Sequence, residues 1–427
     1  MKKILDKKII RYIFTLFFEA IFCCISGALV GLYQLVMQYV LSLSNYLFQT
    51  PNWINILIVV SSLIILFPIN YILIKISPSI DGSGVPYLIK DLHENRKIEY
   101  KKSLVSLYAN SYISSFYGVN LGSEGPSIVI AGKFGRFYQD ITKNDDDDIT
   151  IRIFECSGLG CAFLSPLAGI VYFIESNFKS LKSIKVFIRL ILVCCLSFYI
   201  SSLINQHHLL SINTFDFQFK HVYLILFLVI FNPIIAMIFI KTIIFVKTFF
   251  IHNSSNFFVK YRALILFSIA IVISFTLNYL SGSGTKILSL DYLNMPTYLL
   301  LGILIYKIVM TSIYGSGSIT GGLVLPSMTL GCITAQILLN LVGNDLLPST
   351  SYHSLIILIS MCMMFGCING NPLTASILVA STVYGCTYNV IDVLIIIPTV
   401  LISNYLSYFI CKEFNVTGLY SKLNDIK

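Results

Sequence analysis

Charged residues are scarce in this sequence. Only 11% of the 427 residues are charged, against about 25% in soluble domains, whereas 56% are hydrophobic and the mean hydropathy is +0.82. This composition excludes an ordinary soluble domain and indicates an integral membrane protein. Apolar runs of roughly 17 to 25 residues mark membrane spans. The candidates are Tyr12–Leu43, Trp53–Ile76, Val186–Ile204, Val222–Phe250, Ala263–Leu280, Tyr298–Ile313, Leu355–Phe365 and Val390–Ile410.

Several signatures of other protein classes are also missing. The 11 cysteines are scattered without a CxxC motif, which disfavours a disulfide framework or a metal site. His207-His208 has no matching cluster of ligands, so we expect no metal and no cofactor. No HExxH, nucleophile motif or phosphate-binding loop is present. A membrane-embedded enzyme built on Glu124, Glu175 and His207 is therefore a distant alternative.

The basic residues are concentrated in short loops and at the N-terminus, although the net charge is +9. Positive-inside topology explains this pattern better than nucleic-acid binding and places both termini in the cytoplasm. No cleavable signal peptide or soluble regulatory (CBS) domain is evident. We expect one membrane domain over residues 1–427, with halves near 12–205 and 218–410 and a short segment 412–427. A bias toward Ile, Asn, Lys and Phe suits a bacterial cytoplasmic membrane.

One carboxylate, Glu124, lies in apolar sequence within Gly122-Ser123-Glu124-Gly125-Pro126. A charge at bilayer depth costs about 2.5 to 3.5 kcal/mol on insertion scales, so such a residue usually faces a bundle interior or an aqueous path. The following residues 127–137 form a plausible helix, and Pro126 favours its first turn. Free N–H groups at a helix start suit an anion. Glu124 is then a tethered competitor for that anion.

Two further Gly/Pro-rich loops also lead into short helices. The first is Gly82-Ser83-Gly84-Val85-Pro86, and the second, residues 315–326, reads GSGSITGGLVLP. Three helix starts, near Ser83, Glu124 and Val324, are predicted to converge on one anion through partial charges of roughly +0.5 each. The backbone N–H groups of Leu323 and Val324 are among the expected donors. No Lys or Arg lies in these motifs, which favours weak binding compatible with conduction.

A weak internal duplication links the two halves. Gly122, Pro126 and Ser127 recur 200 residues later as Gly322, Pro326 and Ser327. Gly160-Cys161 with Pro166-Leu167 recurs 206 residues later as Gly366-Cys367 with Pro372-Leu373. The order is preserved, so a loop insertion explains the difference of six. Repeats with interrupted short helices are typical of transporters whose site lies between the halves.

Four motifs in order resemble the CLC family of chloride channels and chloride/proton exchangers over nearly the whole chain. They are GSGVP at Gly82–Pro86, GSEGP at Gly122–Pro126 with its continuation through Gly135-Arg136, PLAGIVYFIE at Pro166–Glu175 and GGLVLP at Gly321–Pro326. The resemblance implies an all-α inverted-repeat membrane fold with many tilted, partly non-spanning helices. It also implies a homodimer with one pore per subunit. The implied pore-motif residues are Gly82, Gly84, Pro86, Gly122, Gly125, Pro126, Gly322 and Pro326.

The same resemblance assigns roles to individual residues. Ser83 matches the serine whose hydroxyl coordinates chloride, and Tyr420 matches the tyrosine across that ion. Leu323 and Val324 match positions that supply backbone amides. Glu124 matches the gating glutamate, which competes with the anion and carries a proton. A serine at position 83 also favours chloride over nitrate, and the intact GSGVP motif disfavours a fluoride exporter.

The chain departs from the family pattern at three places. Ser123 stands where the family usually has Lys or Arg, and Tyr87 replaces a common acidic residue. Glu175 and Ser176 occupy the two acidic positions after PLAG, and the second holds the internal proton-transfer glutamate in many exchangers. Serine does not titrate, so Ser176 argues against tight proton coupling, although water or Glu175 is a possible substitute.

We therefore expect chloride transport through a pore gated by Glu124. Chloride/proton exchange is slightly favoured because Glu124 is present. A passive, gated chloride channel is the main alternative because Ser176 replaces the internal glutamate. A non-transporting membrane scaffold is a third hypothesis, and it predicts no stabilisation of the protein by halide.

Overall fold

The structure is a computed structural model. It describes residues 2–94, 99–142, 148–178, 181, 183–206, 222–343, 350–382 and 390–424. His207-His208, considered above as metal ligands, lies outside these residues.

The described part of the chain is almost entirely helical. It contains no named strand, only two isolated bridges that pair Gly82 with Thr320 and Gly122 with Gly322. Four short 3-10 turns, at Pro78–Ile80 (η1), Asn278–Leu280 (η4), Thr285–Ser289 (η5) and Tyr292–Asn294 (η6), connect longer elements. The α-helices are α1 (Lys2–Gln49), α2 (Trp53–Ile76), α3 (Val85–His93), α4 (Lys101–Phe116), α5 (Glu124–Thr142), α6 (Ile149–Ala162), α7 (Pro166–Asn177), α8 (Ile184–Ile204), α9 (Val222–His252), α10 (Phe257–Lys260), α11 (Arg262–Thr276), α12 (Thr297–Gly315), α13 (Val324–Val342), α14 (Thr350–Asn369), α15 (Pro372–Thr382), α16 (Val390–Glu413) and α17 (Leu419–Asn424). The predicted all-α membrane fold is confirmed.

Seven helices within the described residues are long and apolar enough to cross a membrane: α1 from Phe14, α2, α8, α9, α12, α13 and α14 from Tyr352. Two expectations were wrong. The stretch Ala263–Leu280 is the shorter helix α11 followed by a 3-10 turn, because its helix stops at Thr276. Residues 324–342 form a helix of spanning length that the hydropathy pattern missed, since its N-terminal half carries Pro, Ser, Thr and Gly.

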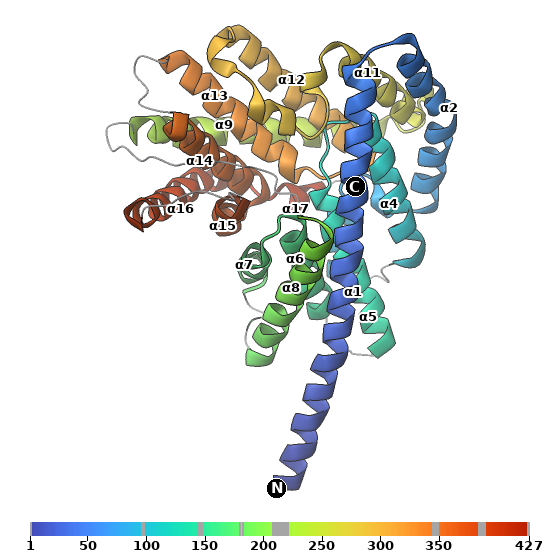
Figure 1. The fold of residues 1–427 in the computed structure, drawn as a ribbon, viewed down its shortest axis with the longest axis vertical. Helices are drawn as coiled ribbons and strands as arrows, with labels where there is room; N and C mark the ends of the chain where they lie inside the picture. Colours follow the sequence, from blue (N-terminus) through green and yellow to red (C-terminus); the bar gives the residue numbers. More distant parts are fainter. Residues whose placement is uncertain are drawn as a thin grey trace.

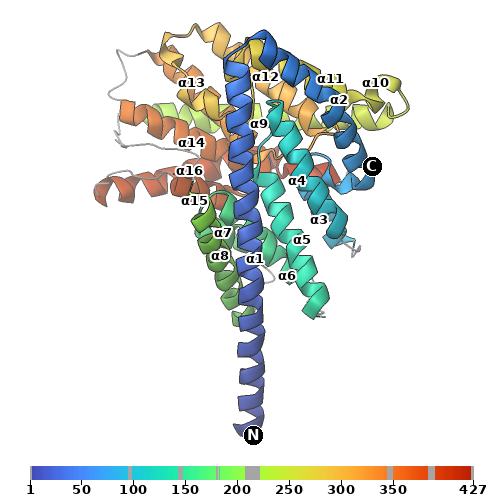
Figure 2. The same cartoon turned by 45° about the vertical axis from the view of Figure 1, so that its right-hand side comes forward.

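Helix α1 runs along one side of the molecule, and its N-terminal end extends beyond the other helices (Figure 1). The view turned by 45° shows the same extension, with α4 and α5 beside α1 on one side and α7 and α8 on the other (Figure 2). Short α17 packs mainly against α3 and also contacts α9 and α14.

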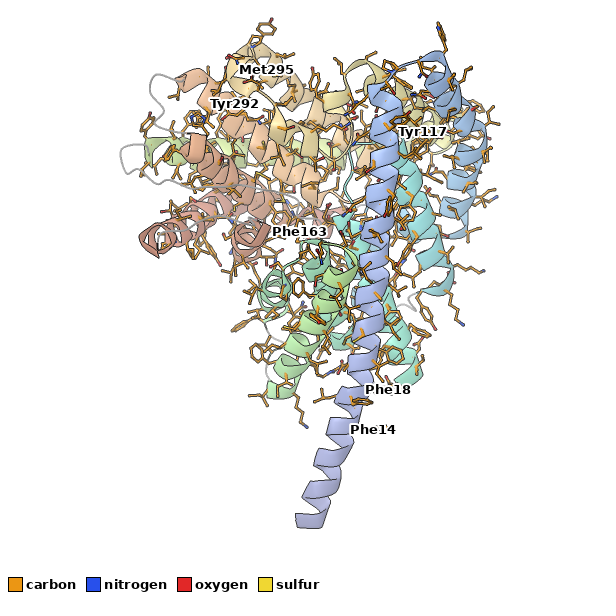
Figure 3. The ribbon with its side chains drawn as sticks, in the orientation of Figure 1. Phe14, Phe18, Tyr117, Phe163, Tyr292 and Met295 are labelled. Atoms are coloured by element: carbon orange, nitrogen blue, oxygen red, sulfur yellow. The ribbon has the colours of Figure 1, made fainter. Side chains whose placement is uncertain are left out.

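Large apolar side chains cover much of the outer surface, as expected for lipid contact. Phe14 on α1 is 69% exposed and, like Phe18 on the same helix, lies away from the main body of the fold (Figure 3). Trp53 on α2 is 83% exposed. Tyr117 and Phe163, by contrast, are buried between helices. This distribution is that of a protein whose solvent is a bilayer.

Small residues bring helices into backbone contact in both halves. A Cβ atom added at Gly158 on α6 would lie 2.6 Å from the carbonyl oxygen of Ser127 on α5. In the second half, a Cβ atom at Gly331 on α13 would lie 2.5 Å from the carbonyl oxygen of Ser360 on α14. The α5–α6 and α13–α14 pairs are the packing counterparts of the sequence duplication. Close packing of this kind is what small residues provide in membranes.

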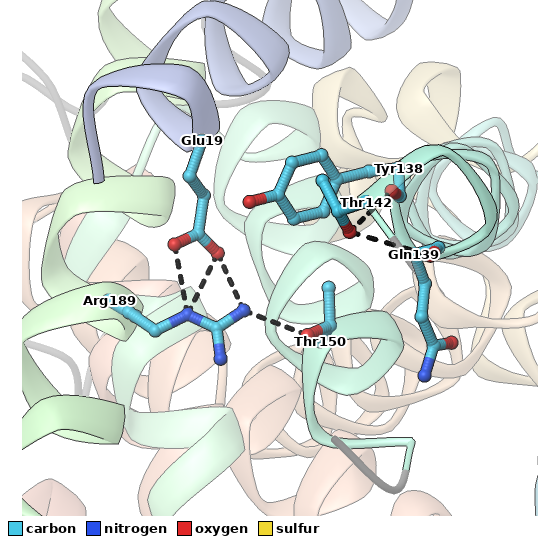
Figure 4. Close-up of polar contacts among 6 residues, drawn as sticks. All are labelled: Glu19, Tyr138, Gln139, Thr142, Thr150 and Arg189. Carbon is cyan, nitrogen blue, oxygen red and sulfur yellow. Dashed lines mark hydrogen bonds and ion pairs between the residues drawn. The ribbon is translucent and has the colours of Figure 1, made fainter. Parts of the chain in front are cut away.

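A buried ion pair ties α1 to α8 and α6. The Arg189 guanidinium donates from Nε to Glu19 Oε1 and Oε2, both at 2.9 Å, and from Nη2 to Glu19 Oε1 at 2.8 Å. The same Nη2 donates to Thr150 Oγ1 at 2.8 Å (Figure 4). Glu19 is fully buried and Arg189 is 7% exposed. The two charges therefore depend on each other for compensation.

We predict that Arg189→Met destabilises the protein, because it leaves the Glu19 carboxylate buried without its cation. Removing one partner of a buried pair costs about 3 to 5 kcal/mol, whereas apolar replacement of both partners is often neutral. The double variant Glu19→Leu/Arg189→Met should therefore recover much of the lost thermal stability. The measurement is the Tm of purified protein in detergent. An Arg189→Met protein with the wild-type Tm would contradict the assigned role of this pair.

Candidate functional site

Three helices begin within three residues of the predicted positions. Helix α3 starts at Val85 after Gly84, whose φ of +73° is a left-handed conformation that favours glycine. Helix α5 starts at Glu124, three residues earlier than predicted, and α13 starts at Val324. Each helix carries a proline in its first turn, where the missing N–H costs no hydrogen bond. The Gly/Pro signals thus correctly predict all three starts.

The three motif loops meet at Gly125. A Cβ atom added there would lie 2.8 Å from Gly322 Cα and 2.9 Å from Ser83 Cβ, both too close for a real contact. Only a glycine allows the GSGVP, GSEGP and GGLVLP loops to approach this closely. The predicted convergence of the three helix starts is therefore present in the structure.

Backbone hydrogen bonds join the same loops. Gly122 N–H donates to Gly322 O at 2.8 Å, and Gly322 N–H donates to Gly122 O at 2.5 Å. Gly82 N–H donates to Ile319 O at 3.0 Å, and Gly321 N–H donates to Gly82 O at 2.8 Å. The Gly122–Gly322 pair is reciprocal and joins equivalent residues of the two repeats. The candidate site consequently lies where the halves meet.

Buried polar side chains support this junction from one side. Thr320 Oγ1 donates to Ile80 O and accepts from Asn110 Nδ2, both at 2.8 Å. Asn70 Nδ2 donates in turn to Asn110 Oδ1 at 2.6 Å. The chain of contacts connects α2 and α4 to the loops before α3 and α13. It fixes the loops without any formal charge.

Glu124 lies at the junction with its side chain 2% exposed. Its Oε1 accepts a long hydrogen bond of 3.4 Å from Ser123 Oγ, and its Oε2 has no hydrogen-bond partner among the described residues. A Cβ atom at Gly122 would lie 2.1 Å from Oε2 and 3.4 Å from Leu325 Cβ. The carboxylate therefore occupies the space beside Gly122 at the start of α13. The backbone N–H groups of Glu124 and Leu325 also act on this carboxylate.

Two hydroxyl groups, of Ser83 and Tyr420, lie near the junction. Ser83 Oγ accepts from Val85 N–H at 3.3 Å, which leaves its own proton free to donate. The phenol oxygen of Tyr420 on α17 lies near Ser83 and the backbone of Leu323, yet it has no hydrogen-bond partner among the described residues. A buried hydroxyl without a partner is costly. Together with the helix starts, these two hydroxyls form a donor set for an anion.

Ser123 and Tyr87, described above as departures from the motifs of the resembled family, both contact other helices. Ser123 donates to Gln34 Oε1 at 3.1 Å, and Gln34 Nε2 donates to Ser127 Oγ at 2.8 Å, so uncharged groups occupy this side of Glu124. The Tyr87 ring lies under Lys247 Nζ, 5.9 Å from the ring centroid, in a cation–π contact. Tyr87 thus contacts α9 instead of offering a carboxylate.

The two predicted inner positions have different surroundings. Glu175 Oε1 accepts from Leu373 N–H at 2.9 Å, and its Oε2 accepts from Thr374 N–H at 2.9 Å and Thr374 Oγ1 at 2.6 Å. Glu175 therefore caps the start of α15. Ser176 Oγ accepts from Asn371 Nδ2 at 3.1 Å and lines a cavity of about 170 Å³ that also reaches Tyr420 and Val324.

Glu155 also lines this cavity, and the sequence analysis did not single it out. The available signal was the one used for Glu124, a lone carboxylate in an apolar stretch. Asn110 and Thr320 were likewise missed, because no local pattern distinguishes a supporting polar residue. Among the described residues, no group of three or more His, Cys, Asp or Glu side chains is placed to hold a metal.

Comparison with known proteins identifies relatives of this chain. A sequence model described as "Voltage gated chloride channel" matches residues 63–408. An uncharacterized protein of Methanocaldococcus jannaschii, MJ0305, is 29% identical over 275 residues, which are 62% of this chain and 68% of that protein.

Solved structures share the fold at low sequence identity. A slow cyanobacterial Cl⁻/H⁺ antiporter matches with a TM-score of 0.80 and 18% identity, over 95% of this chain and 97% of its own. A CLC-type fluoride/proton antiporter matches with a TM-score of 0.75 and 16% identity, over 96% and 98%. A eukaryotic CLC transporter matches with a TM-score of 0.72 and 18% identity, over 96% and 74%. These matches confirm the fold expected from the four motifs.

The close approach at Gly125 makes a prediction about stability. Gly125→Ala should lower the Tm in detergent, because the new methyl group meets Gly322 Cα and Ser83 Cβ at under 3 Å. Gly302→Ala on α12 is the matched control, since a Cβ atom there has no neighbour within 4 Å. Alanine is favoured over glycine in a helix by about 1 kcal/mol, so this control should be neutral or stabilising. Equal Tm changes in the two variants would contradict the close junction.

Proposed function

Because the chain belongs to the voltage-gated chloride channel (CLC) family, we propose that it carries chloride across the membrane in exchange for protons, with Glu124 as the gate. One observation supports this proposal most strongly. Three helix starts and two hydroxyl groups converge beside a buried carboxylate that has an unpartnered oxygen. Neutral donors beside a movable anion suit a site that chloride enters and leaves.

Chloride would be bound without any full positive charge. The donors are Ser83 Oγ, Tyr420 Oη and the backbone N–H groups of Leu323 and Val324. The helix starts add partial charges of roughly +0.5 each, which attract an anion without trapping it. The buried Tyr420 hydroxyl would gain the partner that the protein itself does not provide.

Glu124 would control the outer part of the path by competing with chloride. As a carboxylate it occupies the anion-attracting space at the starts of α5 and α13. When it is protonated or swings outward, it no longer competes, and chloride takes its place. A proton would therefore move in one direction as chloride moves in the other, because both use the same position in turn.

A passive, gated chloride channel is the second candidate function. It is favoured by Ser176, which replaces a titrating group at the inner position. Chloride is preferred over fluoride as the substrate because the GSGVP motif is intact. We further propose a homodimer with one pore per subunit, in the cytoplasmic membrane of a bacterium, with both termini cytoplasmic.

The reversal potential of the current through reconstituted protein distinguishes the two functions. In the wild type it should shift when a pH gradient is imposed at constant chloride, because protons are coupled to chloride. Glu124→Gln and Glu124→Ala should retain chloride flux while losing this shift and any pH-dependent gating. A wild-type reversal potential that does not change with the pH gradient would rule out chloride/proton exchange. If the reversal potential of Glu124→Ala still shifts with the pH gradient, Glu124 is not the gate.

Ser83→Pro should raise nitrate flux relative to chloride flux. The substitution removes the serine hydroxyl from the donor set beside Gly125, and the family resemblance associates proline here with nitrate preference. The measurement is the ratio of nitrate to chloride efflux from liposomes. Ser79→Ala, a serine before the motif whose hydroxyl accepts from Lys133 Nζ at 3.3 Å, is the control and should leave the ratio unchanged. An unchanged ratio of nitrate to chloride efflux in Ser83→Pro would show that Ser83 does not line the pore.

A further inference from the structure

The inner cavity connects the anion site to the position of Ser176. Its volume is about 170 Å³, enough for several water molecules. Ile128, Val324 and Tyr420 line the end toward the anion site, and Ser176 and Asn371 line the other end. The cavity wall is mostly apolar, with Glu155, Ser176 and Tyr420 among its polar members, and Ser176 cannot carry a proton as a titrating group.

Glu155 on α6 places a carboxylate in this cavity. The residue is 5% exposed and lines the cavity wall. Within the described part of the chain, no hydrogen bond or ion pair joins its oxygens to another residue, but the nearby Arg152 guanidinium interacts with its charge. Arg152, one turn earlier on the same helix, donates instead to Asn177 Oδ1 at 2.8 Å. A buried carboxylate without a structural partner is costly and suggests a functional role.

Glu175, the other acidic residue near Ser176, is already used structurally. Its two oxygens accept three hydrogen bonds from Leu373 and Thr374 at the start of α15. Protonation of Glu175 would weaken this cap. Glu155 has no such competing interaction, so it is the better group to accept and release a proton.

Glu155 lies beside α5, at a point further along that helix than Glu124. A Cβ atom added at Gly132 on α5 would lie 3.5 Å from Glu155 Cβ. Gly132 is eight residues, or about 12 Å at 1.5 Å per residue, further along α5 than Glu124. Ile128 lies midway and lines the cavity. This rise along the helix is longer than a hydrogen bond, so we infer that transfer between the two carboxylates uses intervening water.

We propose that Glu155 is the inner proton-transfer residue of this protein, in place of the carboxylate absent at Ser176. A proton from the inner solution binds the Glu155 carboxylate, passes through water in the cavity to the Glu124 carboxylate, and is released outside when Glu124 swings outward. The titratable side chains around Glu155 are Arg152 and Cys156 on α6, Tyr172 on α7 and Tyr420 on α17. The assignment rests on the proposed exchange function.

The test uses full-length protein in liposomes, with chloride efflux and chloride-driven proton uptake recorded together. Glu155→Gln should lower proton uptake by about a hundredfold or more, the range typical of losing an acid–base group, while chloride efflux stays near the wild-type rate. Glu413→Gln removes an exposed carboxylate at the end of α16 and should change neither flux. Ser176→Glu added to Glu155→Gln should restore proton uptake, because it returns a carboxylate to the same cavity.

The outcomes separate this inference from the proposed function. Wild-type protein that passes chloride without protons would overturn both exchange and the role of Glu155. Coupled wild-type protein whose proton uptake survives Glu155→Gln would overturn only the role of Glu155. Loss of both fluxes in Glu155→Gln and also in Glu155→Asp would assign Glu155 to structure and overturn the proposal. Retained coupling in Glu155→Asp supports a titrating role.

Discussion

The reciprocal pairing of Gly122 with Gly322 is the constraint on which the site depends. Two backbone hydrogen bonds, at 2.8 and 2.5 Å, join equivalent loops of the two halves. The pairing brings Gly125 so close to Gly322 and Ser83 that a methyl group at Gly125 would not fit. Because of this contact, the starts of α3, α5 and α13 face a common space. Without it, each would be an ordinary interrupted helix.

The electrostatics of that space come from backbone and hydroxyl groups. Lys and Arg are absent from the three motif loops, and Ser123 stands where the family usually has a cation. Dipoles fixed by a rigid junction need no reorganisation when an ion arrives. The charged member of the candidate site is the carboxylate of Glu124, for which we propose competition with the anion. A bidentate pair of opposite charges, Glu19–Arg189, is buried elsewhere in the fold, between α1 and α8.

Local signals in the sequence predicted the helix starts and the junction well. Gly84, Pro86, Gly125, Pro126 and Pro326 lie just before or within the first turns of α3, α5 and α13, as expected for glycine and proline at helix starts. The duplication predicted a site between the halves, and its equivalent residues Gly122 and Gly322 pair in the structure. The length of α13 was not predicted, since its small and polar residues suit burial inside protein and lower its hydropathy. A buried helix such as α13 is stabilised by packing against neighbouring helices, and the hydrophobic periodicity of its own sequence does not predict that packing.

Contacts between residues far apart in the sequence were predicted only where the family resemblance implied them, and the others were not predicted. Tyr420 lies almost 340 residues after Ser83, and no local pattern indicates that the two meet. The importance of Glu155 depends on a cavity lined by residues of α3, α5, α6, α7, α13, α14 and α17. Ser176 suggested a missing carboxylate by comparison with the family, but a substitute on another helix is a property of tertiary packing. Sequence spacing does not encode it.

The central claim is that an anion binds at the junction of the three helix starts. Anomalous scattering from a crystal of the protein grown in bromide tests it directly. The account predicts a peak within hydrogen-bonding reach of Ser83 Oγ, Tyr420 Oη and the N–H groups that begin α13. Ordered bromide found only beside lysine or arginine side chains, with none at the junction, would contradict it.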